Sequence, residues 1–157
     1  MKITLKALAT VLSIVSLLTI FGCGGDPPPA KSIQDQQLEK LSATWRTSEV
    51  TLDGASKKID YKDFALVLTG TAGATSFGYS VTGRPSNSPW PPSGSWAFGA
   101  NPESQMVRDE TKDKLDMMYV LSANGDTLQI SFTFSGTGYP ARVSNVKGAW
   151  VFTFVKA

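Results

Sequence analysis

Hydrophobic and polar side chains alternate one by one along much of the chain after residue 45. Within 128–134, for example, Leu, Ile, Phe and Phe are separated by Gln, Ser and Thr. This period of two is typical of a β-strand that has one buried face and one wetter face. The best-patterned segments are 64–68, 77–82, 95–98, 127–134 and 150–155.

The strongest hairpin signal joins 115–122 to 127–134 through the residues Ala-Asn-Gly-Asp at 123–126. Asn-Gly tolerates positive φ at both turn positions, so it favours a tight turn between antiparallel strands. The sequence therefore predicts that these two segments are neighbours in a sheet.

Two weaker candidates, 45–52 and 105–109, bring the number of expected strands to eight. No segment between them is long enough for a helical crossover, so we expect an antiparallel meander. Trp45 stands at an odd-numbered position, whereas Val50 and Leu52 stand at even-numbered positions, so a regular strand would place them on opposite faces. A bulge or a sharp bend between them would place all three on the same face.

One short helix is expected before the first strand, over about 32–42. Ser32 is typical of an N-cap, and Asp35 three residues later is a variant of the capping box. A single apolar stripe follows, formed by Ile33, Leu38 and Leu41. The helix should therefore bury only one face.

The first 22 residues have the pattern of a secretion signal. Lys2 and Lys6 precede an apolar stretch at 7–21, which is shorter than the roughly 20 residues that a spanning helix needs. Ile20-Phe21-Gly22-Cys23 resembles the bacterial lipobox, and Cys23 is the only cysteine, which excludes an internal disulfide.

The lipobox resemblance implies a lipid on Cys23, which would become the first residue of the mature protein. Several acyl chains give lasting membrane attachment. By the same analogy, Gly24 after the cysteine favours the outer membrane of the cell envelope over the inner membrane. Residues 23–31, rich in Gly and Pro, are expected to form a linker to a domain at 32–157.

Eight short strands behind a short helix fit a closed barrel or, alternatively, a β-sandwich. The segment Leu-Ser-Ala-Thr-Trp at 41–45 resembles the opening of lipocalin-like (calycin-like) domains, in which a G-x-W strand start follows a short helix. Gly94-Ser95-Trp96 and Gly148-Ala149-Trp150 show the G-x-W pattern later in the chain. The resemblance implies a lipocalin-like barrel of the kind found in small bacterial lipoproteins.

Composition argues against several functions. Without Lys2 and Lys6, the 15 basic residues become 13, which equals the 13 acidic residues, so the domain has no charge surplus for nucleic acid. The chain has no His, which excludes a Ser-His-Asp triad. The acidic residues of 109–116 are interleaved with lysines and lack EF-hand spacing. We therefore expect no enzyme, no metal and no cofactor.

The most unusual segment is 83–94, in which Trp90 stands among prolines. It is either a binding loop, with Trp90 stacking on a ligand and Arg84 supplying a charge, or a lid in which Trp90 plugs the core. The plug is favoured because Trp is usually largely buried. Trp90, Arg84 and Tyr79 are the candidate ligand-binding residues.

The aromatic stripes at 96–98, 132–134 and 150–154 could line a pocket or fill the barrel. An eight-stranded barrel is just wide enough for either, and this many bulky residues favour solid packing with a narrow pocket near one mouth. We expect an envelope lipoprotein that binds a small apolar or amphipathic ligand or acts as an assembly partner. The alternative is a β-sandwich that binds glycan on aromatics such as Trp90 and Tyr79.

Overall fold

The structure of this protein is a computed structural model that describes residues 30–109, 113–140 and 146–157. The expected signal at 1–22, with Cys23 and most of the linker, lies outside these residues. Lys31–Ala157 forms one compact unit that contains the closed sheet and its hydrophobic core. Because it has its own core, this unit is expected to fold independently.

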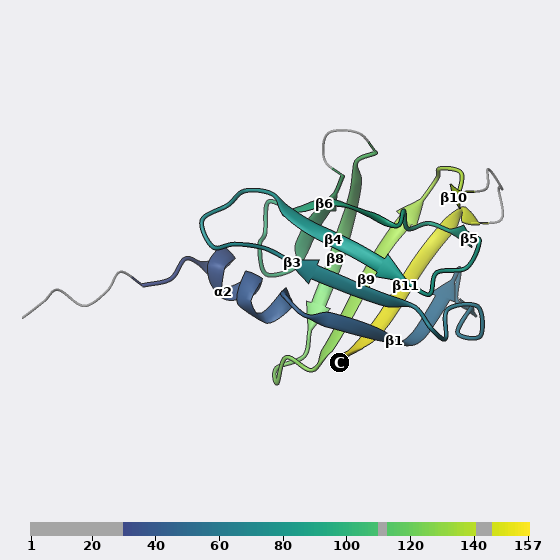
Figure 1. The fold of residues 1–157 in the computed structure, drawn as a ribbon, viewed down its shortest axis with the longest axis horizontal. Coiled ribbons are helices and arrows are strands. Elements are labelled where there is room, and N and C mark those ends of the chain that lie inside the picture. Colours follow the sequence, from purple (N-terminus) through teal and green to yellow (C-terminus); the bar gives the residue numbers. More distant parts are fainter. Residues whose placement is uncertain (1–29, 110–112, 141–145) are drawn as a thin grey trace, which may run out of the picture. The chain divides into compact units, whose positions relative to one another are not determined.

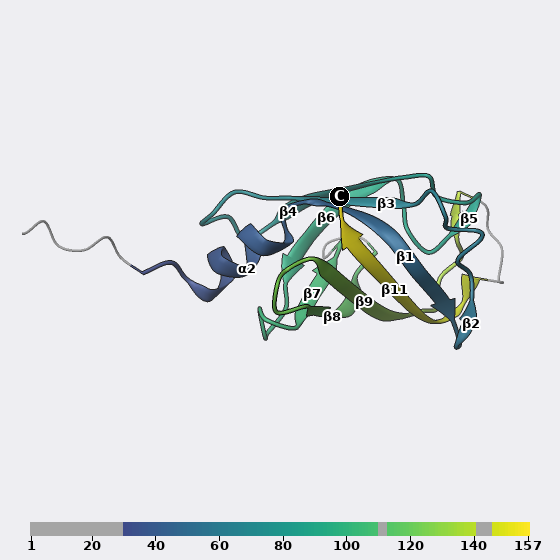
Figure 2. The same cartoon turned by 90° about the horizontal axis from the view of Figure 1, so that it is seen from below.

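Eight antiparallel strands close into a barrel (Figures 1 and 2). Each strand pairs with the next in the barrel, and β1 also pairs with β11, which closes the sheet. The strands are β1 (Thr44–Leu52), β3 (Ala65–Thr69), β4 (Phe77–Thr82), β6 (Ser93–Phe98), β7 (Gln105–Arg108), β8 (Leu115–Leu121), β9 (Thr127–Phe134) and β11 (Gly148–Lys156). All eight expected strands are confirmed, and the alternative β-sandwich is wrong because the sheet has no opening between β1 and β11.

Three two-residue strands were not expected. β2 (Ala55–Ser56) extends the sheet beside β1, and β5 (Asn87–Ser88) pairs with β10 (Tyr139–Pro140) in a separate small sheet. In Figure 1, β5 and β10 lie at the end of the barrel opposite the helix α2 (Ile33–Leu41). They are too short for their pattern to be recognised in the sequence.

The helix α2 begins where Ser32 and Asp35 predict, and it ends at Leu41, within one residue of the expected end. The Ser32 side chain accepts a hydrogen bond of 3.0 Å from the Asp35 backbone N–H, which satisfies one donor of the first turn. Leu38 and Leu41 are buried and belong to the barrel core, whereas Ile33 is exposed. The helix therefore packs on the barrel with part of its apolar stripe, as expected for a one-faced helix.

The predicted bulge in the first strand is confirmed. The register between β1 and β11 shifts between Thr47 and Glu49, so Ser48 has no partner across the ladder. The Ser48 hydroxyl instead donates to the Thr153 carbonyl at 3.1 Å. The additional residue brings both Trp45 and Val50 to the inner face, where both are completely buried.

The inward side chains of β9 and β11 form the densest part of the core. All are buried: Leu128, Ile130, Phe132, Phe134, Trp150, Phe152 and Phe154. Phe152 stacks between Phe132 and Phe154 at centroid distances of 5.9 Å. Their rings occupy the barrel interior, which fits the expectation of solid packing.

Two local expectations need correction. In β6, Ala97 is buried and Phe98 is only half-buried, because Ala97 and Val107 form a cross-strand pair that shields both side chains.

The 123–126 turn has positive φ at Gly125 alone, not at Asn124. A Gly125 N–H to Ser122 carbonyl bond of 2.9 Å closes it, so the loop is built around a common four-residue turn.

The two G-x-W tripeptides share an unexpected arrangement. In each, the N–H of the middle residue donates to a carboxylate on another strand's end: Ser95 to Asp109 at 2.9 Å, and Ala149 to Asp53 at 2.8 Å. Both aspartates have positive φ, near 50°. A Cβ on either glycine would lie within 2.4 Å of the carboxylate, so only glycine leaves room for this contact.

Candidate functional site

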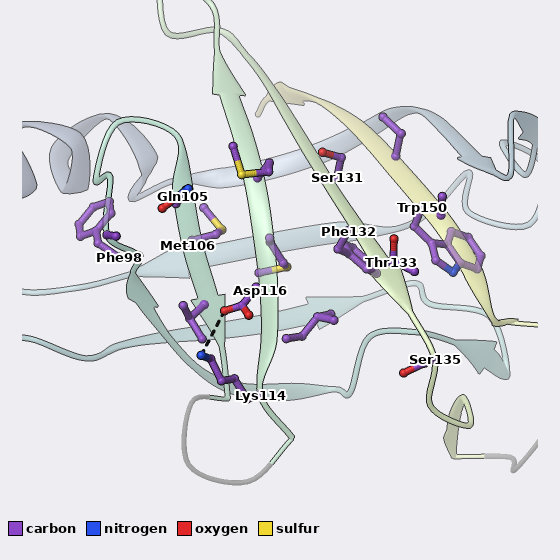
Figure 3. Close-up of a pocket in the computed structure, with 18 residues that line it drawn as sticks. Phe98, Gln105, Met106, Lys114, Asp116, Ser131, Phe132, Thr133, Ser135 and Trp150 are labelled. Atoms are coloured by element: carbon purple, nitrogen blue, oxygen red, sulfur yellow. Dashed lines mark ion pairs between the residues drawn. The ribbon is translucent and has the colours of Figure 1, made fainter.

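The strands β8 and β9 separate partway along their length. Their pairing runs from Leu121↔Leu128 to Met118↔Ser131 and then stops. Beyond that point, Leu115–Met117 pair only with β7, and Phe132–Phe134 pair only with β11. Figure 3 shows the two strands adjacent near Ser131 and apart near Thr133 and Asp116.

The separation creates an open cleft of about 1020 Å³, which we call the β8–β9 cleft. Its lining residues come from β6 to β9 and from β11, and they include Phe98, Met106, Met117, Met118, Phe132, Trp150 and Val151. Hydroxyl groups of Ser131, Thr133 and Ser135 follow the β9 side. The cleft thus combines apolar walls with uncharged polar groups, as ligand sites commonly do.

Trp90 packs inside the barrel at the level where the two strands are apart. An eight-stranded barrel has just enough room for the side chains of its own strands. Trp90 enters from the segment that precedes β6, and its ring contacts those of Phe132 and Phe152 at centroid distances of 5.8 and 6.0 Å. The indole therefore occupies interior space at the level of Phe132, where the β8–β9 pairing has already ended.

The charges on the cleft cancel. Lys114 and Asp116 are the only charged lining residues among those described, and their Nζ and Oδ1 atoms lie 3.4 Å apart. Both side chains are more than half exposed. Such a surface ion pair contributes at most about 1 kcal/mol, so it would open readily for a ligand.

The structure does not bring the predicted ligand-binding residues into this cleft. Trp90 is 1% exposed and occupies the core, which confirms its interpretation as a plug. Tyr79 is also buried, its hydroxyl donating to Asp109 Oδ2 at 2.8 Å, and Arg84 is half-buried. The indole and phenol thus offer no open face for glycan stacking; a role of the three residues in binding stays a prediction.

Arg108 is a buried cation that the sequence pattern did not reveal. Its guanidinium lies over the Trp90 ring at 5.2 Å, and Nη1 donates to the Pro89 carbonyl at 2.8 Å. Its Nε is 3.2 Å from Asp109 Oδ2, as an ion pair without hydrogen-bond geometry. These contacts fix the proline-rich segment to β7, which explains how the plug is held.

The resolved pKa shifts in the barrel concern tyrosines. Burial raises the pKa of Tyr61 to about 12, and burial also raises the pKa of Tyr119, whose hydroxyl donates to the Pro102 carbonyl. Both hydroxyls therefore stay protonated at neutral pH and act as hydrogen-bond donors. Such groups hold structure and do not supply a base for catalysis.

Within the described ranges, no group of three or more His, Cys, Asp or Glu side chains could hold a metal ion. In the same part of the chain, no helix has both the length and the apolar character to cross a membrane. Comparison with protein-family models, with curated proteins and with solved structures finds no match. The closed barrel itself is consistent with the lipocalin-like fold that the G-x-W segments suggest.

Proposed function

We propose that this chain is a lipid-anchored protein of the bacterial cell envelope whose barrel binds an apolar or amphipathic ligand in the β8–β9 cleft. The observation that carries the proposal is the position of the open space. The barrel interior is occupied by aromatic rings, whereas the cleft is open, apolar and of a volume typical of ligand sites. The ligand would thus bind in the wall of the barrel, between β8 and β9, and not inside the barrel along its axis.

The exposed apolar residues on the outer face of β8 provide the sharpest test. Met118 is 48% exposed and lines the cleft, whereas Val120 is 64% exposed, faces the same way on the same strand and lies outside the cleft. Residues 31–157 should bind the fluorescent apolar probe 1-anilinonaphthalene-8-sulfonate. Met118→Glu should weaken this binding about tenfold, and Val120→Glu should leave it nearly unchanged.

Equal losses in both variants would show that the probe responds to overall charge, and no binding to the wild-type domain would refute the proposal. The variants should keep nearly wild-type stability, because both side chains are solvent-exposed. Thermal melts of the same samples therefore separate a binding defect from misfolding.

The proposed anchor rests on residues outside the described ranges, namely the signal pattern that ends at Gly22-Cys23. We propose the outer membrane as its location, on the analogy that Gly24 provides. The Gly and Pro residues that follow Cys23 would then serve as the tether between the anchor and the barrel.

A further inference from the structure

We infer that the ligand of the β8–β9 cleft is an extended peptide segment that adds as a short strand to β9 at Thr133. This inference rests on the proposed binding function of the cleft and names the chemical class of the ligand. Strand addition is a common way to bind peptides, in which backbone hydrogen bonds give affinity and side-chain pockets give specificity.

The direction of the backbone groups follows from the hydrogen bonds of neighbouring residues. Ser122 N–H donates to the Thr127 carbonyl at 2.9 Å. Because hydrogen-bonded pairs alternate along an antiparallel ladder, the backbone N–H and C=O groups of even-numbered residues in β8 point toward β9, and those of odd-numbered residues in β9 point toward β8. Tyr119 N–H donates to the Ser104 carbonyl at 2.8 Å, so the backbone N–H and C=O groups of odd-numbered residues in β8 point toward β7 and away from β9. Neither the β8–β9 nor the β9–β11 register contains a shift.

This alternation directs the N–H and C=O of Thr133 into the cleft. The register that pairs Met118 with Ser131 would next pair Asp116 with Thr133, but no such pairing exists. On its other side, Thr133 lies opposite Ala149, whose N–H and C=O bond to Asp53, and the flanking pairs Phe132–Trp150 and Phe134–Gly148 keep β9 in the ladder. The Thr133 N–H and C=O therefore face the cleft in a fixed position, and no described strand pairs with Thr133 on that side.

The two sides of the cleft differ in charge, which selects β9 as the receiving strand. Lys114 and Asp116 stand at the β8 side, and charged side chains at a strand edge oppose the addition of another strand. The β9 side presents the uncharged side chains of Ser131, Thr133 and Ser135. An incoming strand can therefore approach β9 without burying an unpaired charge.

The side chains of the cleft define the peptide further. In a strand that pairs with Thr133, alternate residues point inward toward Met117 and Phe132 and outward toward solvent. The inward residues should be apolar, because the buried surface there consists of Met and Phe side chains. The expected ligand is thus an extended segment in which every second residue is apolar.

The test uses residues 31–157 and a fluorescein-labelled peptide that copies 114–120 of β8. Residues 118–120 of this sequence pair with β9 in the domain, and its Leu115, Met117 and Tyr119 provide the alternate apolar side chains. The peptide should bind the wild-type domain, and Thr133→Pro should weaken binding about tenfold, since proline lacks the N–H. Thr133→Ala keeps the N–H and should bind as the wild type does. A scrambled peptide and one N-methylated at the position of Asp116, which this register sets opposite Thr133, should bind at least about tenfold more weakly.

The same samples are titrated with 1-anilinonaphthalene-8-sulfonate to separate the two proposals. Probe binding without peptide binding would overturn the inference and leave the proposed function intact. Peptide binding that is equal in wild type and Thr133→Pro would also overturn it, because the β9 backbone would then not be the docking site. Absence of binding of either molecule would refute both proposals.

Discussion

Proline substitutions at Ser131 and Thr133 test whether the β8–β9 ladder ends where the structure places its end. The backbone N–H of Ser131 faces Met118 across the ladder, whereas that of Thr133 faces the cleft. Proline at either position restricts φ in the same way and removes the N–H. Only the substitution at Ser131 therefore also breaks a strand-to-strand hydrogen bond and leaves a carbonyl on β8 without its donor.

The expected difference follows from that single bond. Loss of one backbone hydrogen bond at this partly exposed position costs about 0.5–1.5 kcal/mol, which is measurable against the roughly 5–15 kcal/mol that a domain of this size has. Ser131→Pro should thus lower the free energy of unfolding by about 0.5–1.5 kcal/mol more than Thr133→Pro does. The shared cost of restricting φ cancels in this comparison.

Urea denaturation followed by tryptophan fluorescence measures both variants, with Ser131→Ala and Thr133→Ala as controls for loss of the side chains. The alanine variants should each lie within about 0.5 kcal/mol of the wild type, since neither hydroxyl is buried. Equal costs of the two proline substitutions, at unchanged denaturant slopes, would mean that Thr133 is paired as Ser131 is and that the cleft does not exist in solution.

Three further predictions address other parts of the molecule. Gly94→Ala should destabilise the domain by about 1–3 kcal/mol in urea melts, because its Cβ would lie 2.2 Å from Asp109 Oδ1, while Ser93→Ala should cost little. The free energy of unfolding should fall between about pH 10 and about pH 12, because folding raises the pKa of Tyr61 to about 12, and Tyr61→Phe should reduce this fall in alkaline melts. Cys23→Ser should abolish labelling of the full chain by radioactive palmitate; label kept at the wild-type level would contradict the proposed anchor.

The strands could be predicted because each carries its own local signal. Alternation in 127–134 and 150–155 sets which side chains are buried. Trp45 and Val50 can share the inner face only if one additional residue lies between them, and the structure shows this residue as the bulge at Ser48. Ser32 and Asp35 set the start of the helix in the same local way. These features need no knowledge of residues distant in the sequence.

The cleft could not be predicted, because it depends on contacts between distant segments. The end of the β8–β9 ladder coincides with the insertion of Trp90, which the sequence places 42 residues before its neighbour Phe132. Arg108 follows a strand pattern with no sign that its guanidinium is buried against Trp90. The G-x-W glycines were recognised, but the positive-φ aspartates that contact them, Asp53 and Asp109, follow the ends of other strands, β1 and β7.

The most direct test of the binding site is a two-dimensional NMR titration of residues 31–157 with 1-anilinonaphthalene-8-sulfonate. The four tryptophan side-chain N–H signals serve as internal reporters, because Trp150 lines the cleft and Trp45 lies beneath Lys156 outside the cleft lining. Binding in the cleft predicts shifts at Trp150 and at the backbone amides of Thr133 and Asp116, with Trp45 unchanged. Shifts confined to Trp45 or spread evenly over all four indoles would contradict the account.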